Sequence, residues 1–81
     1  MAYDKVSKTI LQRMFNDNKI GSRHLTLQDL QRGFPPHEES NVKRKLEDLV
    51  EKNLILYHAT DHGDEYSLNP QSLDEIEEVL F

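Results

Sequence analysis

The stretch from residue 40 to residue 55 has the clearest amphipathic pattern in the chain. Its apolar residues recur at helical spacing, and they are Val42, Leu46, Leu49 and Val50. This spacing places one narrow apolar stripe on one side of a helix, with polar side chains opposite. Asn53 tolerates the left-handed conformation found just past helix ends, and the apolar run 54–57 has the form of a strand. The pattern predicts a helix that docks by its stripe and leads directly into a strand.

Two helices are predicted before this one. Residues 1–18 carry a broad apolar face, and Asp4 can cap the N-terminus of the helix there. A second, two-turn helix is predicted at 27–32, because residues 26–29 (Thr-Leu-Gln-Asp) come close to a capping box. The glycine and two prolines within 33–36 end it.

A β-hairpin and a last helix are predicted after residue 54. Strands at 55–60 and 65–68 flank the turn 61–64, in which Gly63 supplies the positive φ of a tight hairpin. The expected core or cross-strand residues are Tyr57, Tyr66 and Leu68. Residues 72–75 (Ser-Leu-Asp-Glu) have the form of a capping box and open the last helix, which has one apolar and one acidic face.

The length of 81 residues allows one small domain. A chain this short buries only about 60% of its unfolded surface, so a lean core and a homodimer that buries more apolar surface are both expected. With no cysteine, disulfides and thiolate metal sites are excluded. The start of the chain lacks a signal-peptide pattern, and no apolar run approaches the roughly 20 residues that span a membrane. We therefore expect a soluble, cytoplasmic protein.

The net charge of −5 is distributed unevenly along the chain. Residues 1–36 have a small excess of cations, and residues 37–55 are nearly balanced. Residues 56–81 contain no lysine or arginine, and their carboxylates are Asp61, Asp64, Glu65, Asp74, Glu75, Glu77 and Glu78. The chain is thus mildly basic at its front and strongly acidic at its end.

The predicted order is helix, short strand, helix, turn, helix and hairpin. In this order, and in the apolar spacing of residues 25–30, 40–49, 53–55 and 66–68, the chain resembles the winged helix-turn-helix family. The resemblance covers residues 4–69. It implies an α+β fold with a three-helix core and a small antiparallel hairpin, the wing. We expect this domain at 1–70, followed by an acidic amphipathic helix at 71–81.

The resemblance also implies a function, which is sequence-specific binding of double-stranded DNA by a small transcriptional regulator. Its third helix, at about 40–53, would enter the major groove, where asparagine can pair with adenine and arginine with guanine. The expected base readers are Ser40, Asn41, Arg44 and Lys45, with Lys43 and Lys45 on phosphates. Thr26 and Gln28 would contact the DNA backbone at the start of the second helix.

Two alternatives to DNA binding stay open. Lys43, Arg44 and Lys45 can instead pair within the helix with Glu47, Asp48 and Glu51 and form a solvated face. The domain can also be a protein-interaction module with no nucleic-acid contact, because the predicted wing carries carboxylates where the family usually has cations. The interface, to a second copy or another protein, would then be formed by Leu73, Ile76, Leu80 and Phe81. The same helix can equally well complete the monomer core.

The remaining candidates are weak. His58, Asp61, His62 and Asp64 lie within seven residues and are suitable metal ligands, but such residues are common in hairpin turns. We expect no metal and no cofactor. The chain has no glycine-rich phosphate loop and no nucleophile with a nearby base, so we do not expect an enzyme.

Overall fold

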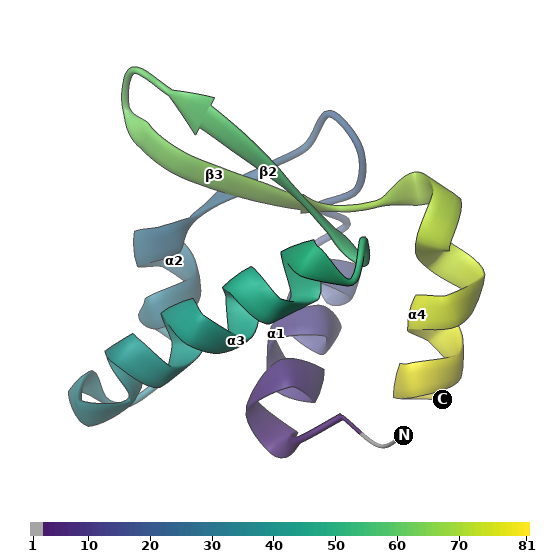
Figure 1. The fold of residues 1–81 in the computed structure, drawn as a ribbon, viewed down its shortest axis with the longest axis horizontal. Coiled ribbons are helices and arrows are strands. Elements are labelled where there is room, and N and C mark those ends of the chain that lie inside the picture. The colour runs from purple at the N-terminus through teal and green to yellow at the C-terminus, as the bar shows by residue number, and fades with distance from the viewer. Residues whose placement is uncertain (1–2) are drawn as a thin grey trace.

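Four α-helices and three β-strands form residues 3–81, the part of the chain that the computed structural model describes (Figure 1). In order they are α1 (Lys5–Asn16), β1 (Leu25–Thr26), α2 (Leu27–Gln31), α3 (Glu39–Glu51), β2 (Ile55–Thr60), β3 (Gly63–Leu68) and α4 (Leu73–Leu80). Short 3₁₀ turns precede α3 and α4, at Pro36–Glu38 and Pro70–Ser72. The α+β class and the order of elements expected from the sequence are confirmed.

The three strands form one antiparallel sheet in the order β1-β3-β2. Tyr66 of β3 lies between Leu25 of β1 and Tyr57 of β2. Thr60 pairs with Gly63, whose φ is +116°, so the hairpin turn contains two residues. The predicted four-residue turn is therefore wrong, because cross-strand pairing continues to Gly63 and β3 starts there.

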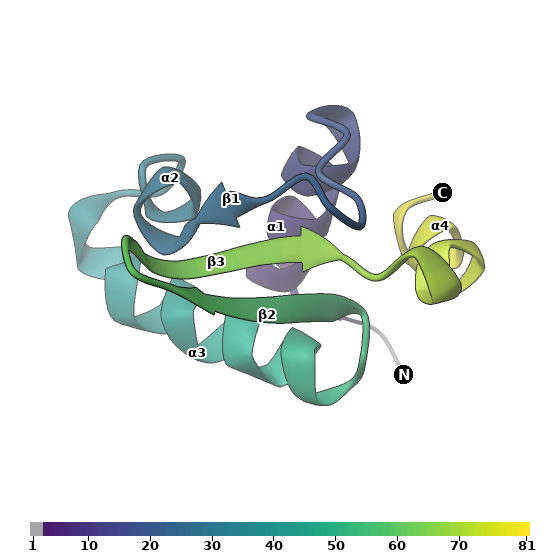
Figure 2. The ribbon, with the colours of Figure 1, turned by 90° about the horizontal axis from the view of Figure 1, so that it is seen from above.

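The core lies between the sheet and the three helices α1, α2 and α3 (Figures 1 and 2). Helix α4 lies to one side of this arrangement and packs on α1. The fully buried apolar side chains of the helices are Ile10, Leu11, Met14, Leu30, Val42, Leu46, Leu49 and Ile76. Three members of the predicted stripe on α3 are thus in the core, and the fourth, Val50, is half-buried.

Two of the predicted helix caps are present. The Oδ1 atom of Asp4 accepts a hydrogen bond of 2.8 Å from the backbone N–H of Ser7, and α1 begins directly after this residue. Thr26 Oγ1 accepts a hydrogen bond of 3.1 Å from the backbone N–H of Asp29 at the start of α2. The second half of that capping box is missing, since the Asp29 carboxylate accepts from Arg32 Nη1 instead.

Other predicted boundaries need correction. Helix α1 starts at Lys5 rather than at residue 1, because the capping residue Asp4 is extended; residues 1–2 lie outside the described part. Ser72 does not cap α4, because its hydroxyl donates to the backbone oxygen of Asn53 at 2.9 Å. Asn53 itself has a φ of +65°, so the left-handed end expected after α3 is confirmed.

Replacing Leu46 by alanine should strongly destabilise the protein. The Leu46 side chain is fully buried between α3 and the rest of the core, so its removal leaves a cavity. We expect a loss of about 2–5 kcal/mol in the free energy of unfolding, measured by urea denaturation. The control Lys43→Ala, at an exposed position of the same helix, should change stability by about 0.5 kcal/mol or less. Equal effects of the two changes would contradict the docking of α3 by this stripe.

Candidate nucleic-acid interface

The face of α3 opposite its buried stripe is exposed along the whole helix. Its N-terminal half carries Ser40, Lys43 and Arg44, all of them exposed. Its C-terminal half continues with the exposed carboxylates of Glu47 and Glu51. The face is therefore divided into a cationic half near the N-terminus and an anionic half near the C-terminus.

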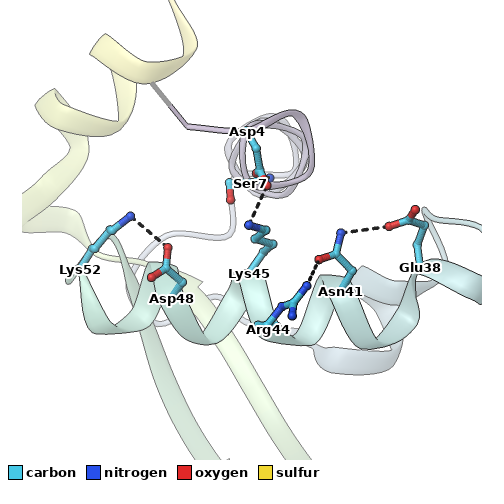
Figure 3. Close-up of polar contacts among 8 residues, drawn as sticks. All are labelled: Asp4, Ser7, Glu38, Asn41, Arg44, Lys45, Asp48 and Lys52. Atoms are coloured by element: carbon cyan, nitrogen blue, oxygen red, sulfur yellow. Dashed lines mark hydrogen bonds and ion pairs between the residues drawn. The ribbon is translucent and has the colours of Figure 1, made fainter. Parts of the chain in front are cut away.

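A chain of hydrogen bonds holds Asn41 and Arg44 in place (Figure 3). The amide nitrogen of Asn41 donates to Glu38 Oε2 at 3.1 Å, and Arg44 Nη2 donates to Asn41 Oδ1 at 3.0 Å. Both the nitrogen and the oxygen of the Asn41 side-chain amide are thus hydrogen-bonded within the protein. The guanidinium group has five N–H donors and uses one of them here, so most of its donors face solvent.

Lys45 has a structural partner. Its Nζ atom lies 2.9 Å from Asp4 Oδ2, so this ion pair joins α3 to the start of α1 (Figure 3). The pKa of Asp4 is lowered to about 2, first because the Ser7 N–H donates to the carboxylate and then because Lys45 does. Lys45, one of the predicted DNA contacts, thus has a partly exposed carboxylate partner next to α1.

Lys52, the residue that directly follows α3, also has a carboxylate partner. Lys52 Nζ lies 3.0 Å from Asp48 Oδ2, and also 4.8 Å from the centre of the Tyr3 ring. The hydrogen bond to Asp48 raises the pKa of Lys52. Among residues 3–81, no ion pair joins the three cations at 43–45 to the carboxylates at 47, 48 and 51. The predicted alternative of pairing within this helix is therefore wrong.

The start of α2 contributes exposed polar groups beside α3. Gln28 is exposed, and the Thr26 hydroxyl accepts the capping hydrogen bond of α2 while its own O–H remains free to donate. A shallow hollow between α2 and the turn that leads to α3 is lined by Gln28, Gln31, Arg32, Phe34, Pro36 and Glu39. Sequence analysis missed Arg32 as a residue on this side, although its spacing of four from Gln28 places both on one helix face.

The hairpin offers no cation next to this face. The Tyr57 side chain is exposed, and its hydroxyl donates to Asp64 Oδ1 at 2.7 Å, which raises the pKa of Tyr57. Burial, followed by the charge of Asp64, raises the pKa of Tyr66 to about 12. The turn adds the exposed carboxylate of Asp61. The tip of the hairpin is thus acidic, with an exposed tyrosine at its base.

The other face of the sheet carries two histidines. The rings of His24 and His58 are 4.1 Å apart between centroids, and His24 Nδ1 lies 3.4 Å from Glu65 Oε1. His58 Nε2 lies 3.3 Å from the buried hydroxyl of Ser67, so His58 and Asp64 of the candidate metal group have separate partners. No set of three or more His, Cys, Asp or Glu side chains within residues 3–81 is arranged to hold a metal ion.

The four apolar residues predicted as an interface on the last helix have different environments. Ile76 is completely buried in the core, so it has no surface to offer a partner. Leu73 and Leu80 are half-buried, and Phe81 is 80% exposed with its ring edge on Phe15. Helix α4 lies at the opposite side of the molecule from the N-terminal end of α3, and so does not cover the cationic half (Figure 1).

Comparison with known proteins found no matching family model, curated protein or solved structure. Within residues 3–81, no helix has both the length and the apolar character needed to cross a membrane.

The Asp4–Lys45 pair predicts a pH dependence of stability. Because folding lowers the pKa of Asp4 from 3.8 to about 2, its stabilising effect is present above pH 3.8 and is lost as the pH falls through 2. Asp4→Asn keeps a cap acceptor but removes the charge. We expect it to reduce stability at pH 7 by up to about 1 kcal/mol, since the pair is partly exposed.

Urea denaturation of both proteins between pH 7 and pH 2 measures this effect. The stability difference between them should shrink as the pH falls below about 4 and should be only a small fraction of its pH 7 value at pH 2. Asp61→Asn is the control, because Asp61 forms no ion pair within the described residues. A difference for Asp4→Asn that stays constant down to pH 2 would show that the charge does not contribute.

Proposed function

We propose that this protein is a winged-helix protein that binds double-stranded DNA sequence-specifically, with the N-terminal half of α3 in the major groove. The observation that carries the proposal is the pair Lys43 and Arg44. Both are exposed, and neither has a carboxylate partner among residues 3–81. Ser40 lies on the same face one turn earlier.

The arrangement of elements suits this mode of binding. An α-helix fits the major groove of B-DNA, and α3 is held from behind by its buried stripe and on its flank by the Asp4–Lys45 pair. Its N-terminal end lies away from the acidic α4 (Figure 1). Helix α2 packs on α3, and the β2–β3 hairpin follows α3 in the chain, which is compatible with the role of a wing.

The contacts within the protein suggest a role for each of the expected DNA-binding residues. Arg44 is the principal candidate for reading a guanine, because Asn41 orients its guanidinium and leaves most donors free. Lys43 would contact phosphates without breaking an ion pair, and Ser40 and Gln28 add exposed polar groups. Arg32 and Lys45 each have a carboxylate partner, Asp29 and Asp4, but keep further N–H donors for phosphates. Thr26 also stays in the set, because its Oγ1 accepts from the Asp29 N–H and its O–H remains free to donate.

The acidic wing has a measurable consequence for affinity. Neutralisation of phosphates by cationic side chains supplies much of the binding energy in protein–DNA complexes. The number of phosphates neutralised sets the salt dependence of the affinity. With phosphate contacts from Lys43, Lys45 and Arg32, the slope of log K against log salt should be roughly −3 per protomer. Binding is then weak per protomer, which favours a dimer that reads two half-sites.

A protein-interaction module without nucleic-acid contact is the second candidate. The carboxylates of Asp61 and Asp64 at the hairpin tip favour it, together with Glu47 and Glu51 on the exposed face of α3. These charges repel phosphates and would suit a basic protein surface. Under this alternative, the labelled protein would show no change in its amide NMR spectrum when duplex DNA is added at low salt.

Replacing Arg44 by alanine should weaken DNA binding and relax the preference at one base pair. A target sequence is first selected with the wild-type protein from a pool of randomised duplexes. We expect a loss of about 1–3 kcal/mol on this target, because a bidentate contact to guanine is removed. Fluorescence anisotropy at several salt concentrations measures affinity and salt slope together.

Lys52→Ala is the matched control for this experiment. Lys52 is a cation on the same helix, but it is paired with Asp48 on the side that faces α1. Its replacement should leave DNA affinity within about twofold of the wild type. Equal losses for both variants would mean that binding depends only on net charge, and sequence-specific reading by α3 would be wrong.

A further inference from the structure

Two neighbouring helices carry opposite charges that remain unpaired. Helix α1 exposes Lys5 and Lys8, and α4 exposes only carboxylates among its charged groups. The acidic residues of α4 are Asp74, Glu75, Glu77 and Glu78. Within residues 3–81, none of these six side chains takes part in an ion pair. Lys8 shares a hollow with Glu75 and Glu78 of the same copy but forms no ion pair with either, so the charges of the two helices are only partly compensated within one copy.

The boundary between α1 and α4 is hollowed on both sides. Tyr3, Lys8 and Val79 line both hollows. The outer hollow, which follows the exposed side of α1, also contains Lys5 and reaches Leu80 of α4. A partly apolar depression with cations along it is thus present beside an acidic helix.

We propose that this surface is the interface of a homodimer, in which the acidic helix α4 of each copy lies against the basic side of α1 in the other. A two-fold axis makes such an interface self-complementary, because residue i contacts residue j and residue j contacts residue i. Each α1–α4 contact then forms twice. A partner that was only acidic or only basic would satisfy one of the two helices and repel the other.

The apolar side chains at this surface match the centre of such an interface. Val79 and Leu80 are half-buried, and Tyr3 lies beside them in the hollow. Typical interfaces have an apolar centre with a polar rim and bury about 800 Å² per partner, which is about 15% of the 5223 Å² surface of this chain. A small domain with a lean core gains stability from this burial.

The proposed interface is separate from the DNA-binding proposal. It uses α4 and the side of α1 that borders α4, and α4 lies at the opposite side of the molecule from the N-terminal end of α3 (Figure 1). The dimer can therefore be tested without DNA. Failure of DNA binding leaves this inference intact, and the absence of a dimer leaves the exposed face of α3 unchanged.

Charge reversal on either helix should dissociate the dimer. One variant combines Lys5→Glu with Lys8→Glu on α1, and the other combines Glu77→Lys with Glu78→Lys on α4. Each opposes like charges across the proposed interface, so we expect the dissociation constant to rise about tenfold or more. Sedimentation equilibrium of the full chain measures it, with circular dichroism to show that both variants are folded.

Mixing the two variants is the decisive measurement. In a mixed dimer the acidic α1 meets the basic α4, and the basic α1 meets the acidic α4, so native mass spectrometry should show a heterodimer. Lys43→Glu with Arg44→Glu on α3 is the matched control, because it reverses two charges away from the surface and should leave the dimer intact. A wild-type protein that is monomeric at about 0.5 mM would overturn the proposal. The proposal would also be overturned if the charge reversals left the dimer unchanged, or if the two variants formed no heterodimer when mixed.

Discussion

Burial of the stripe formed by Val42, Leu46 and Leu49 is the interaction on which the rest of this structure depends. These three side chains have no exposed surface and lie where α1, α2 and the sheet meet. Because a helix buried on one side is exposed on the other, the same packing presents Lys43 and Arg44 to solvent. The same helical spacing therefore places the apolar residues of α3 in the core and the cations proposed to bind DNA on the surface.

Polar contacts then divide the cations of α3 into two groups. Lys45 and Lys52 lie on the side facing α1, where Asp4 and Asp48 neutralise them. Such partly exposed pairs contribute little energy individually, so the difference is that Lys43 and Arg44 need break no ion pair within residues 3–81 to contact a ligand. The resulting surface is cationic over a short length of the helix, in a protein whose hairpin and last helix are acidic.

Much of the fold was predictable because local signals agreed with one another. The apolar spacing of α3, the cap at Asp4 and the left-handed residue Asn53 each depend on neighbours in the sequence, and the structure contains all three. The capping role expected for Ser72 was wrong because a distant carbonyl, that of Asn53, takes its hydroxyl. For the candidate site, the sequence predicted which residues are exposed. It did not predict the hydrogen bonds and ion pairs that these residues form.

The sequence by itself determined which residues are apolar at helical or strand spacing, and hence the order of the elements and the side of α3 that is buried. Only the tertiary structure decided that Lys45 meets Asp4, that Ile76 belongs to the core, and that the acidic α4 lies beside α1. The physical reason is the range of the interactions. Periodicity and caps act within a few residues, whereas the pairing of a charge depends on segments that come together only when the chain folds.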